Sequence, residues 1–141
     1  MKNKILLAIP LVTSIYSAHA NNCGNLNVSV FNKSGHTCTL RSTNLTNGQI
    51  IFGQVPGIIE NGEKALAFTL QQTYTAGPSI RLEYECDNKT ISIVSRQDLC
   101  VMYAGSVSGD YSSSNNVHAD YIAKIGSWWS SLPGEINWTI G

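Results

Sequence analysis

The sequence predicts an all-β fold, a single antiparallel β-sandwich held together by two disulfides. Short segments alternate apolar and polar residues, as half-buried strands do. Gly and Asn turn signals separate these segments at spacings of roughly 8–12 residues, which is typical of a sandwich or barrel. No window of about eleven residues keeps a convincing helical period. We therefore predict two packed sheets and no long helix.

The first half of the chain predicts five short strands, over residues 26–30, 37–41, 50–52, 58–59 and 66–70. Leu26, Val28 and Val30 are apolar at every second position, so one face of that segment is buried. Asn61-Gly62 is a strong two-residue hairpin turn and separates the fourth segment from the fifth.

The second half contains the clearest strand, residues 80–86, in which apolar and charged side chains alternate without interruption. A turn at 87–89 leads into the return strand, 90–94, and an apolar stretch follows at 99–104. The polar stretch 106–116 predicts a long exposed loop. Two segments complete the chain: 117–125, either strand or short helix, and 136–140, a closing strand.

The first twenty residues predict a cleavable signal peptide. Lys2 and Lys4 precede an apolar run over residues 5–15, and Ala18-His19-Ala20 is a small-residue cleavage site. Residues 21–141 then form the β-sandwich binding domain, secreted or periplasmic. Loss of the two lysines leaves seven Lys+Arg against nine Asp+Glu. That balance excludes a basic nucleic-acid surface and a polybasic membrane anchor.

Four cysteines, Cys23, Cys38, Cys86 and Cys100, lie in the exported part. An even count in an oxidising compartment predicts two disulfides. Sequence alone permits three connectivities. The spacings favour two local bridges, Cys23–Cys38 and Cys86–Cys100. Because no C-x-x-C pair occurs, we expect no zinc site and no other metal.

Catalytic motifs are scarce, and we expect neither an enzyme nor a cofactor. His118 and Asp120 would share one side of a strand, but no third group completes a triad or a metal site. Glu83 and Glu85 lie on the charged face of one strand, which is typical of a solvated surface rather than a glycosidase pair.

Aromatic residues become frequent towards the C-terminus, at Tyr103, Tyr111, Tyr121, Trp128, Trp129 and Trp138. Neighbouring strand residues point to opposite faces, so Trp128 and Trp129 cannot both be core. Their surroundings, Ser127 before them and Ser130 after, favour a loop. An exposed amphipathic ring suits a bilayer interface, a sugar face or a protein partner. The alternative is that one Trp packs against the end of the core and the other is a single exposed aromatic residue.

The order of turns and strands through residues 26–103 resembles the actinoporin-like cytolysin and fungal fruit-body lectin group. The resemblance is carried by Asn32-x-Ser34-Gly35, Pro56, Asn61-Gly62, Ala76-Gly77-Pro78 and the strand pair around Tyr84 and Ile91. It implies a compact β-sandwich that recognises membrane phosphocholine lipids or glycans. Ser95 and Tyr103 match part of that group's headgroup cluster, and Trp128-Trp129 corresponds to its paired tryptophan. No amphipathic segment precedes the first strand, so pore formation is not expected.

Three functions follow as hypotheses. The first is a secreted module that recognises a membrane lipid headgroup or a glycan through Ser95, Tyr103, Tyr111, Tyr121, Trp128 and Trp129. The second is a secreted bacterial effector, a virulence factor or protein-interaction module that contacts a host or envelope protein without binding lipid. The third is a small secreted hydrolase that uses His118 and Asp120.

Overall fold

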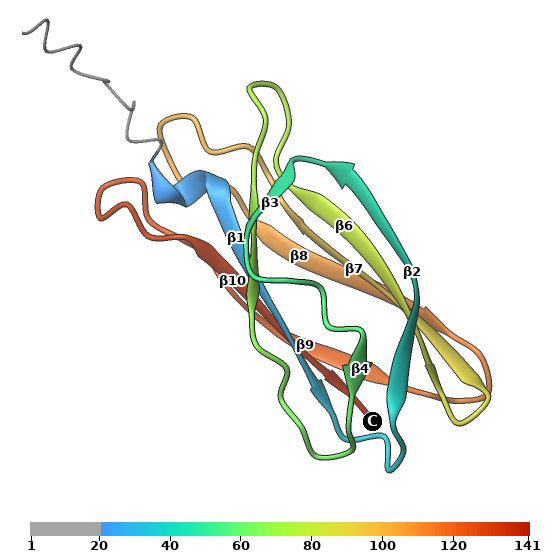
Figure 1. Ribbon diagram of the computed structural model, residues 1–141. Helices are drawn as coiled ribbons and strands as arrows, with labels where there is room; N and C mark the ends of the chain where they lie inside the picture. The colour runs from blue at the N-terminus through green and yellow to red at the C-terminus, as the bar shows by residue number, and fades with distance from the viewer. Residues whose placement is uncertain (1–20) are drawn as a thin grey trace, which may run out of the picture.

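The computed structural model describes residues 21–141, and the signal peptide predicted for residues 1–20 lies outside the described residues. One sheet consists of β3 (Gln49–Phe52), β5 (Phe68–Gln71), β1 (Asn25–Asn32), β10 (Gly134–Ile140) and β9 (Ala119–Lys124), in that order. The other consists of β4 (Ile58–Ile59), β2 (Cys38–Asn47), β6 (Ser79–Cys86), β7 (Lys89–Gln97) and β8 (Val107–Ser113). The two sheets form the layers of a β-sandwich (Figure 1), as the sequence predicts.

Strand pairing is mostly antiparallel, with one departure from the prediction. β1 and β10 pair in parallel, with Leu26 opposite Gly134 and Asn32 opposite Ile140. The other strand pairs within residues 21–141 are antiparallel. A parallel pair requires a long connection, and here the rest of the sandwich supplies it.

The core lies between the sheets and follows the predicted alternation. In β6, Ile80, Leu82 and Tyr84 are buried while the residues between them face outward. β10 contributes Trp138, the largest fully buried side chain, from the opposite sheet. Its indole Nε1 donates a hydrogen bond to Ser95 Oγ on β7 at 2.8 Å. This contact joins the two layers, because β10 and β7 belong to different sheets.

The long exposed loop predicted at 106–116 is wrong, because most of that stretch is β8. The strand pairs with β7 from Gln97 opposite Val107 to Ile91 opposite Ser113. β8 is the last strand of its sheet, and its residues are half-buried or exposed. An edge strand is held mainly by its backbone hydrogen bonds, so it needs little apolar sequence. The ambiguous stretch 117–125 is a strand, β9, over most of its length.

The predicted pairing of the cysteines is also wrong. The structure has Cys23–Cys100 and Cys38–Cys86, with sequence separations of 77 and 48 residues. Cys38 and Cys86 are directly opposite each other on β2 and β6, so sheet register brings them together. Two disulfides are typical of an extracellular or other oxidising compartment.

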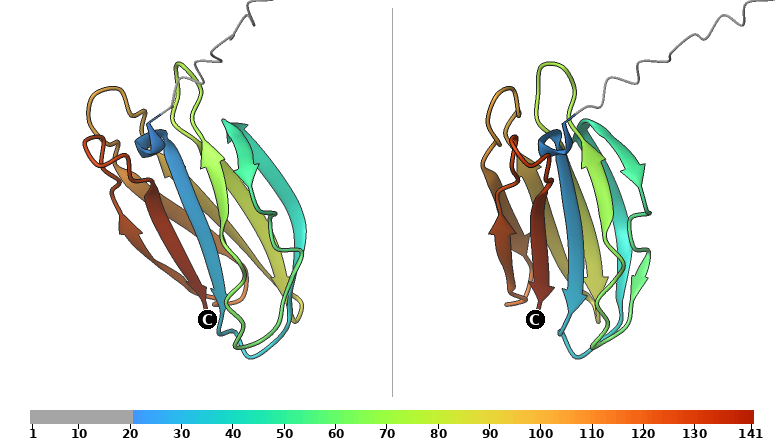
Figure 2. Two further views of the ribbon diagram at one scale, coloured as in Figure 1. Left: turned by 60° about the vertical axis from the view of Figure 1, so that its left-hand side comes forward. Right: turned by 90° about the vertical axis from the view of Figure 1, so that its left-hand side faces the viewer.

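Three loops gather at one end of the sandwich. They join β5 to β6 (residues 72–78), β7 to β8 (98–106) and β9 to β10 (125–133). They lie beside the amino-terminal 3-10 turn, Asn22–Gly24, at the end away from the carboxyl terminus (Figures 1 and 2). We call these three loops and this turn the loop end.

Candidate ligand pocket and loop surface

The loop end exposes large apolar side chains from all three of its loops. Tyr74 is fully exposed in the first loop, and Trp129 is 89% exposed in the third. The other exposed apolar residues here are Val101, Met102, Tyr103, Ile125 and Leu132. Single exposed apolar residues are ordinary on protein surfaces, but a group of this size on adjacent loops indicates an interaction surface.

The same surface is almost free of charge. Asp98, at the start of the second loop, is the one charged residue in the three loops. Long uncharged runs pass through the loop end at residues 21–32, 65–80, 99–109 and 125–134. An uncharged apolar surface can leave water without desolvating an ion, which would be costly.

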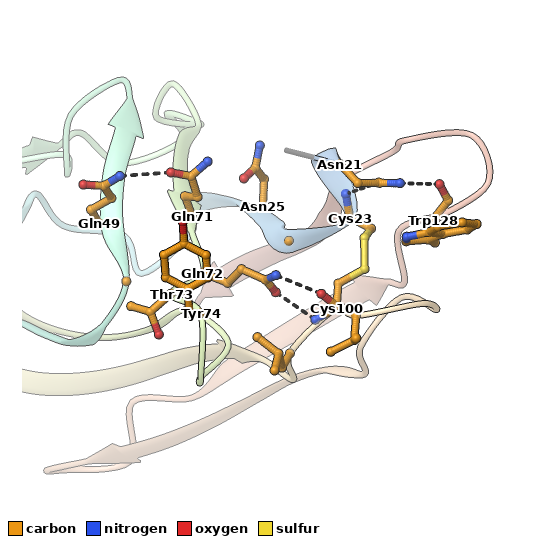
Figure 3. Close-up of a pocket in the computed structure, with 14 residues that line it drawn as sticks. Asn21, Cys23, Asn25, Gln49, Gln71, Gln72, Thr73, Tyr74, Cys100 and Trp128 are labelled. Atoms are coloured by element: carbon orange, nitrogen blue, oxygen red, sulfur yellow. Dashed lines mark hydrogen bonds between the residues drawn. A yellow bond between two sulfur atoms is a disulfide. The ribbon is translucent and has the colours of Figure 1, made fainter. Parts of the chain in front are cut away.

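A pocket of about 710 Å³ opens at this end of the molecule (Figure 3). Its lining comes from the amino-terminal turn, the start of β3, the end of β5 and the first two loops, with Trp128 from the third. Carboxamide side chains are prominent in it: Asn21, Asn25, Gln49, Gln71 and Gln72.

Two of these amides hold the walls of the pocket in place. Gln72 donates from Nε2 to the Cys100 carbonyl at 2.9 Å and accepts the Cys100 N–H at 2.8 Å. Asn21 donates from Nδ2 to the Trp128 carbonyl at 2.5 Å and accepts the Cys23 N–H at 3.0 Å. With the Cys23–Cys100 disulfide, these bonds connect the amino-terminal turn to all three loops. Such networks hold a site's shape before a ligand arrives.

Two other amides face each other across neighbouring strands. Gln49 Nε2 on β3 donates to Gln71 Oε1 on β5 at 2.9 Å. The contact leaves Gln49 Oε1 as an acceptor and Gln71 Nε2 as a donor for other partners. Both residues lie at the pocket end of their strands, where they are directly opposite in register.

Three of the predicted ligand residues lie at the loop end. Trp128 and Trp129 sit in the third loop with their rings edge to face, 5.0 Å between centroids. Trp128 is half-buried and lines the pocket, whereas Trp129 faces solvent. Tyr103 is 76% exposed in the second loop. The structure therefore places all three residues at the loop end, on two of its loops.

The other three predicted ligand residues lie elsewhere. Ser95 is only 1% exposed, and its hydroxyl accepts a hydrogen bond from Trp138 Nε1. The structure therefore places Ser95 in the core, whereas the sequence predicts it on an exposed surface. Tyr111 is on β8, with its hydroxyl 3.3 Å from Nδ1 of His118. Tyr121 is on β9 and packs against Trp138 at 4.9 Å between ring centroids. Both tyrosines belong to edge strands rather than to the loops.

Sequence reasoning missed Tyr74, Val101, Met102 and the pocket amides. Tyr74 stands in the uncharged run 65–80, and the other two belong to the apolar stretch 99–104. An apolar stretch bounded by Asp98 and Gly105 resembles a short buried strand in sequence. Here it lies in the loop between β7 and β8, with Val101, Met102 and Tyr103 exposed and Cys100 bonded to Cys23.

The residues considered for catalysis are all on the surface. His118 and Asp120 are exposed, and Glu83 and Glu85 lie on the outward face of β6. Glu85 accepts a hydrogen bond from Arg41 Nε at 2.8 Å, as expected of a solvated ion pair. Across residues 21–141, no cluster of His, Cys, Asp and Glu side chains is arranged to hold a metal ion. The same part of the chain contains no helix long and apolar enough to cross a membrane.

The fold and the site together define a disulfide-bonded β-sandwich with an aromatic loop end that is almost free of charge. Among solved structures, the chain is similar to the lipid binding protein Nakanori, with a TM-score of 0.66 and 14% identity over 83% of this chain and 70% of that one. It is also similar to IP-1A from Alcaligenes faecalis, with a TM-score of 0.54 and 14% identity over 85% and 91%. No family model matches the sequence, and no curated protein matches it.

These likenesses concern the fold. The likeness to Nakanori supports the β-sandwich fold that the sequence predicts. At 14% identity, neither neighbour carries residue roles to this chain.

Proposed function

We propose that this protein is an exported lipid-binding module whose loop end docks on the interface of a membrane. The observation that carries the proposal is the group of exposed aromatic and aliphatic side chains on three adjacent loops that contain one charged residue. Binding, rather than catalysis, is the proposed activity.

The side-chain chemistry matches the bilayer interface. Trp and Tyr rings prefer the headgroup level, because each joins a large apolar body to a polar N–H or O–H. Trp129 and Tyr103 present such rings on different loops, and Met102 adds a flexible apolar chain beside Tyr103. Lipid headgroups that are zwitterionic or uncharged suit this surface, since it offers no cationic group to pair with an anionic lipid.

One structural neighbour supports this proposal. Nakanori is described as a lipid binding protein, and it shares the sandwich fold at a TM-score of 0.66. A fold alone does not carry function. The proposal therefore rests on the loop end, and the neighbour adds support from a second direction.

The experiment is sedimentation of purified protein with phosphatidylcholine vesicles. Trp129→Ala should weaken partition about tenfold, because burying a large apolar side chain contributes roughly 1.5–3 kcal/mol and ~1.4 kcal/mol corresponds to a factor of ten. Leu66→Ala is the matched control, since Leu66 is 90% exposed but lies outside the loop end. It should change partition by less than about twofold.

Two outcomes would contradict the proposal. One is that wild-type protein stays in the supernatant with vesicles as it does in buffer. The other is that Leu66→Ala and Trp129→Ala weaken sedimentation equally, which would place the contact on the side of the sandwich. Circular dichroism of each variant should be unchanged, because both substituted side chains are exposed.

A further inference from the structure

The pocket at the loop end contains no charged side chain. Its lining consists of carboxamides, Thr73, two glycines, apolar residues, the Cys23–Cys100 bridge and the rings of Tyr74 and Trp128. A phosphate or carboxylate ligand in a protein site is usually met by Arg or Lys. A cationic ligand is usually met by carboxylates or by a cage of aromatic rings. This lining provides no ionic partner, and its two aromatic rings lie on different sides of the pocket instead of forming a cage (Figure 3), so it favours a neutral ligand.

The free polar atoms of the pocket are suited to hydroxyl groups. A hydroxyl both donates and accepts hydrogen bonds, and a carboxamide offers a donor and an acceptor side by side. The contact between Gln49 and Gln71 leaves one acceptor and one donor next to each other at the pocket. Asn25 adds another amide, whose bond to Asn22 is long at 3.4 Å. Two adjacent hydroxyls of one ring could be met by this group.

Aromatic rings provide the apolar part of the lining. Trp128 lies beside the disulfide and Tyr74 lies towards Gln71, so the two rings flank different sides of the pocket (Figure 3). A pyranose has a C–H face that packs on an aromatic ring and an edge of hydroxyls that requires hydrogen bonds. The volume of about 710 Å³ falls within the range typical of small-molecule sites.

We propose that the pocket binds a neutral sugar ring, either free or as the headgroup of a glycolipid. Gln49, Gln71 and Asn25 bond its hydroxyls, and Trp128 or Tyr74 packs against its C–H face. The Gln72–Cys100 and Asn21–Trp128 bonds keep the pocket open in the absence of ligand. The glycolipid case rests on the proposed membrane docking, whereas the free-sugar case does not.

The test is an NMR titration of the side-chain amide signals of purified protein with glucose, galactose, mannose and N-acetylglucosamine. At least one sugar should shift the amide signals of Gln49 and Gln71. Gln71→Met should weaken that sugar's affinity at least about fivefold, and so should Gln49→Met on the exposed edge strand. Gln54→Met is the matched control, because Gln54 is exposed and lies outside the pocket. A parallel titration uses phosphocholine.

A second arm separates this inference from membrane docking. Vesicles of phosphatidylcholine alone should bind wild-type protein and Gln71→Met equally, and added glucosylceramide or galactosylceramide should strengthen binding of the wild type only. Membrane docking without any sugar response would overturn the inference and leave the proposed function standing. A sugar response without vesicle binding would support the sugar pocket and contradict the proposed membrane docking. Phosphocholine shifting the same amides more strongly than every sugar would show that the pocket is not selective for neutral ligands, and would also overturn the inference.

Discussion

Ser95 and Trp138 form a buried polar contact between the two sheets. The indole Nε1 of Trp138 donates to Ser95 Oγ at 2.8 Å, and both residues are about 1% exposed. A buried donor that loses its partner keeps the full cost of leaving water. The hydroxyl at position 95 is therefore placed to stabilise the fold.

Ser95→Ala should lower the free energy of unfolding by about 1–3 kcal/mol, because it leaves the Trp138 N–H unpaired. The measurement is the denaturant midpoint, followed by tryptophan fluorescence. Ser92→Ala, on the same strand but facing outward, should change stability by less than about 0.5 kcal/mol. Equal stability of the Ser95 variant and the wild type would contradict the assigned role.

The sequence predicts whether some individual side chains are exposed, but it does not predict which distant side chains they contact. The adjacency of Trp128 and Trp129 in a polar segment already indicates that at least one faces solvent, and Trp129 does. Nothing local distinguishes Ser95 from an exposed serine. Its burial depends on Trp138, which is 43 residues away in the chain and on the opposite sheet.

At the scale of elements, alternation predicts the central strands well and the edges poorly. β6 and β7 lie within the sheet and bury every second residue, so the period is visible in their sequence. β8 lies at an edge and resembles a polar loop. Cysteine spacing predicts the wrong disulfides because it describes only distance along the chain, whereas the register of β2 and β6 brings Cys38 opposite Cys86.

The two disulfides should differ in their effect on membrane binding. Cys23–Cys100 connects the amino-terminal turn to the loop that carries Tyr103, whereas Cys38–Cys86 joins β2 to β6 at the opposite end (Figure 1). Removing either bridge costs roughly 2–5 kcal/mol of stability. The double substitution Cys23→Ala with Cys100→Ala should also weaken partition to phosphatidylcholine vesicles at least about threefold.

The matched variant is Cys38→Ala with Cys86→Ala. It should lose stability but bind vesicles as the wild type does, provided that both proteins are assayed well below their unfolding midpoints. Equal loss of vesicle binding in the two variants would show that the effect is general destabilisation and not release of the loop end.

At the scale of the whole molecule, charge is segregated. The outward face of β6 alternates Arg81, Glu83 and Glu85, while the loop end carries only Asp98. Charged side chains are therefore distributed over the strands of both sheets and the turns at the opposite end, while the loop end is almost free of them. This arrangement predicts an orientation on a membrane in which the strands are roughly perpendicular to the bilayer plane and the three loops contact lipid.

Quenching of tryptophan fluorescence by acyl-chain-brominated phosphatidylcholine tests that orientation most directly. Trp128 and Trp129 are at the loop end, whereas Trp138 is buried between the sheets and provides an internal reference. On brominated vesicles, the wild type should lose a large part of its emission. The double variant Trp128→Phe with Trp129→Phe emits from Trp138 alone, and brominated vesicles should quench little of that emission. Protein that sediments with the vesicles while its Trp128 and Trp129 emission stays unquenched would contradict the account.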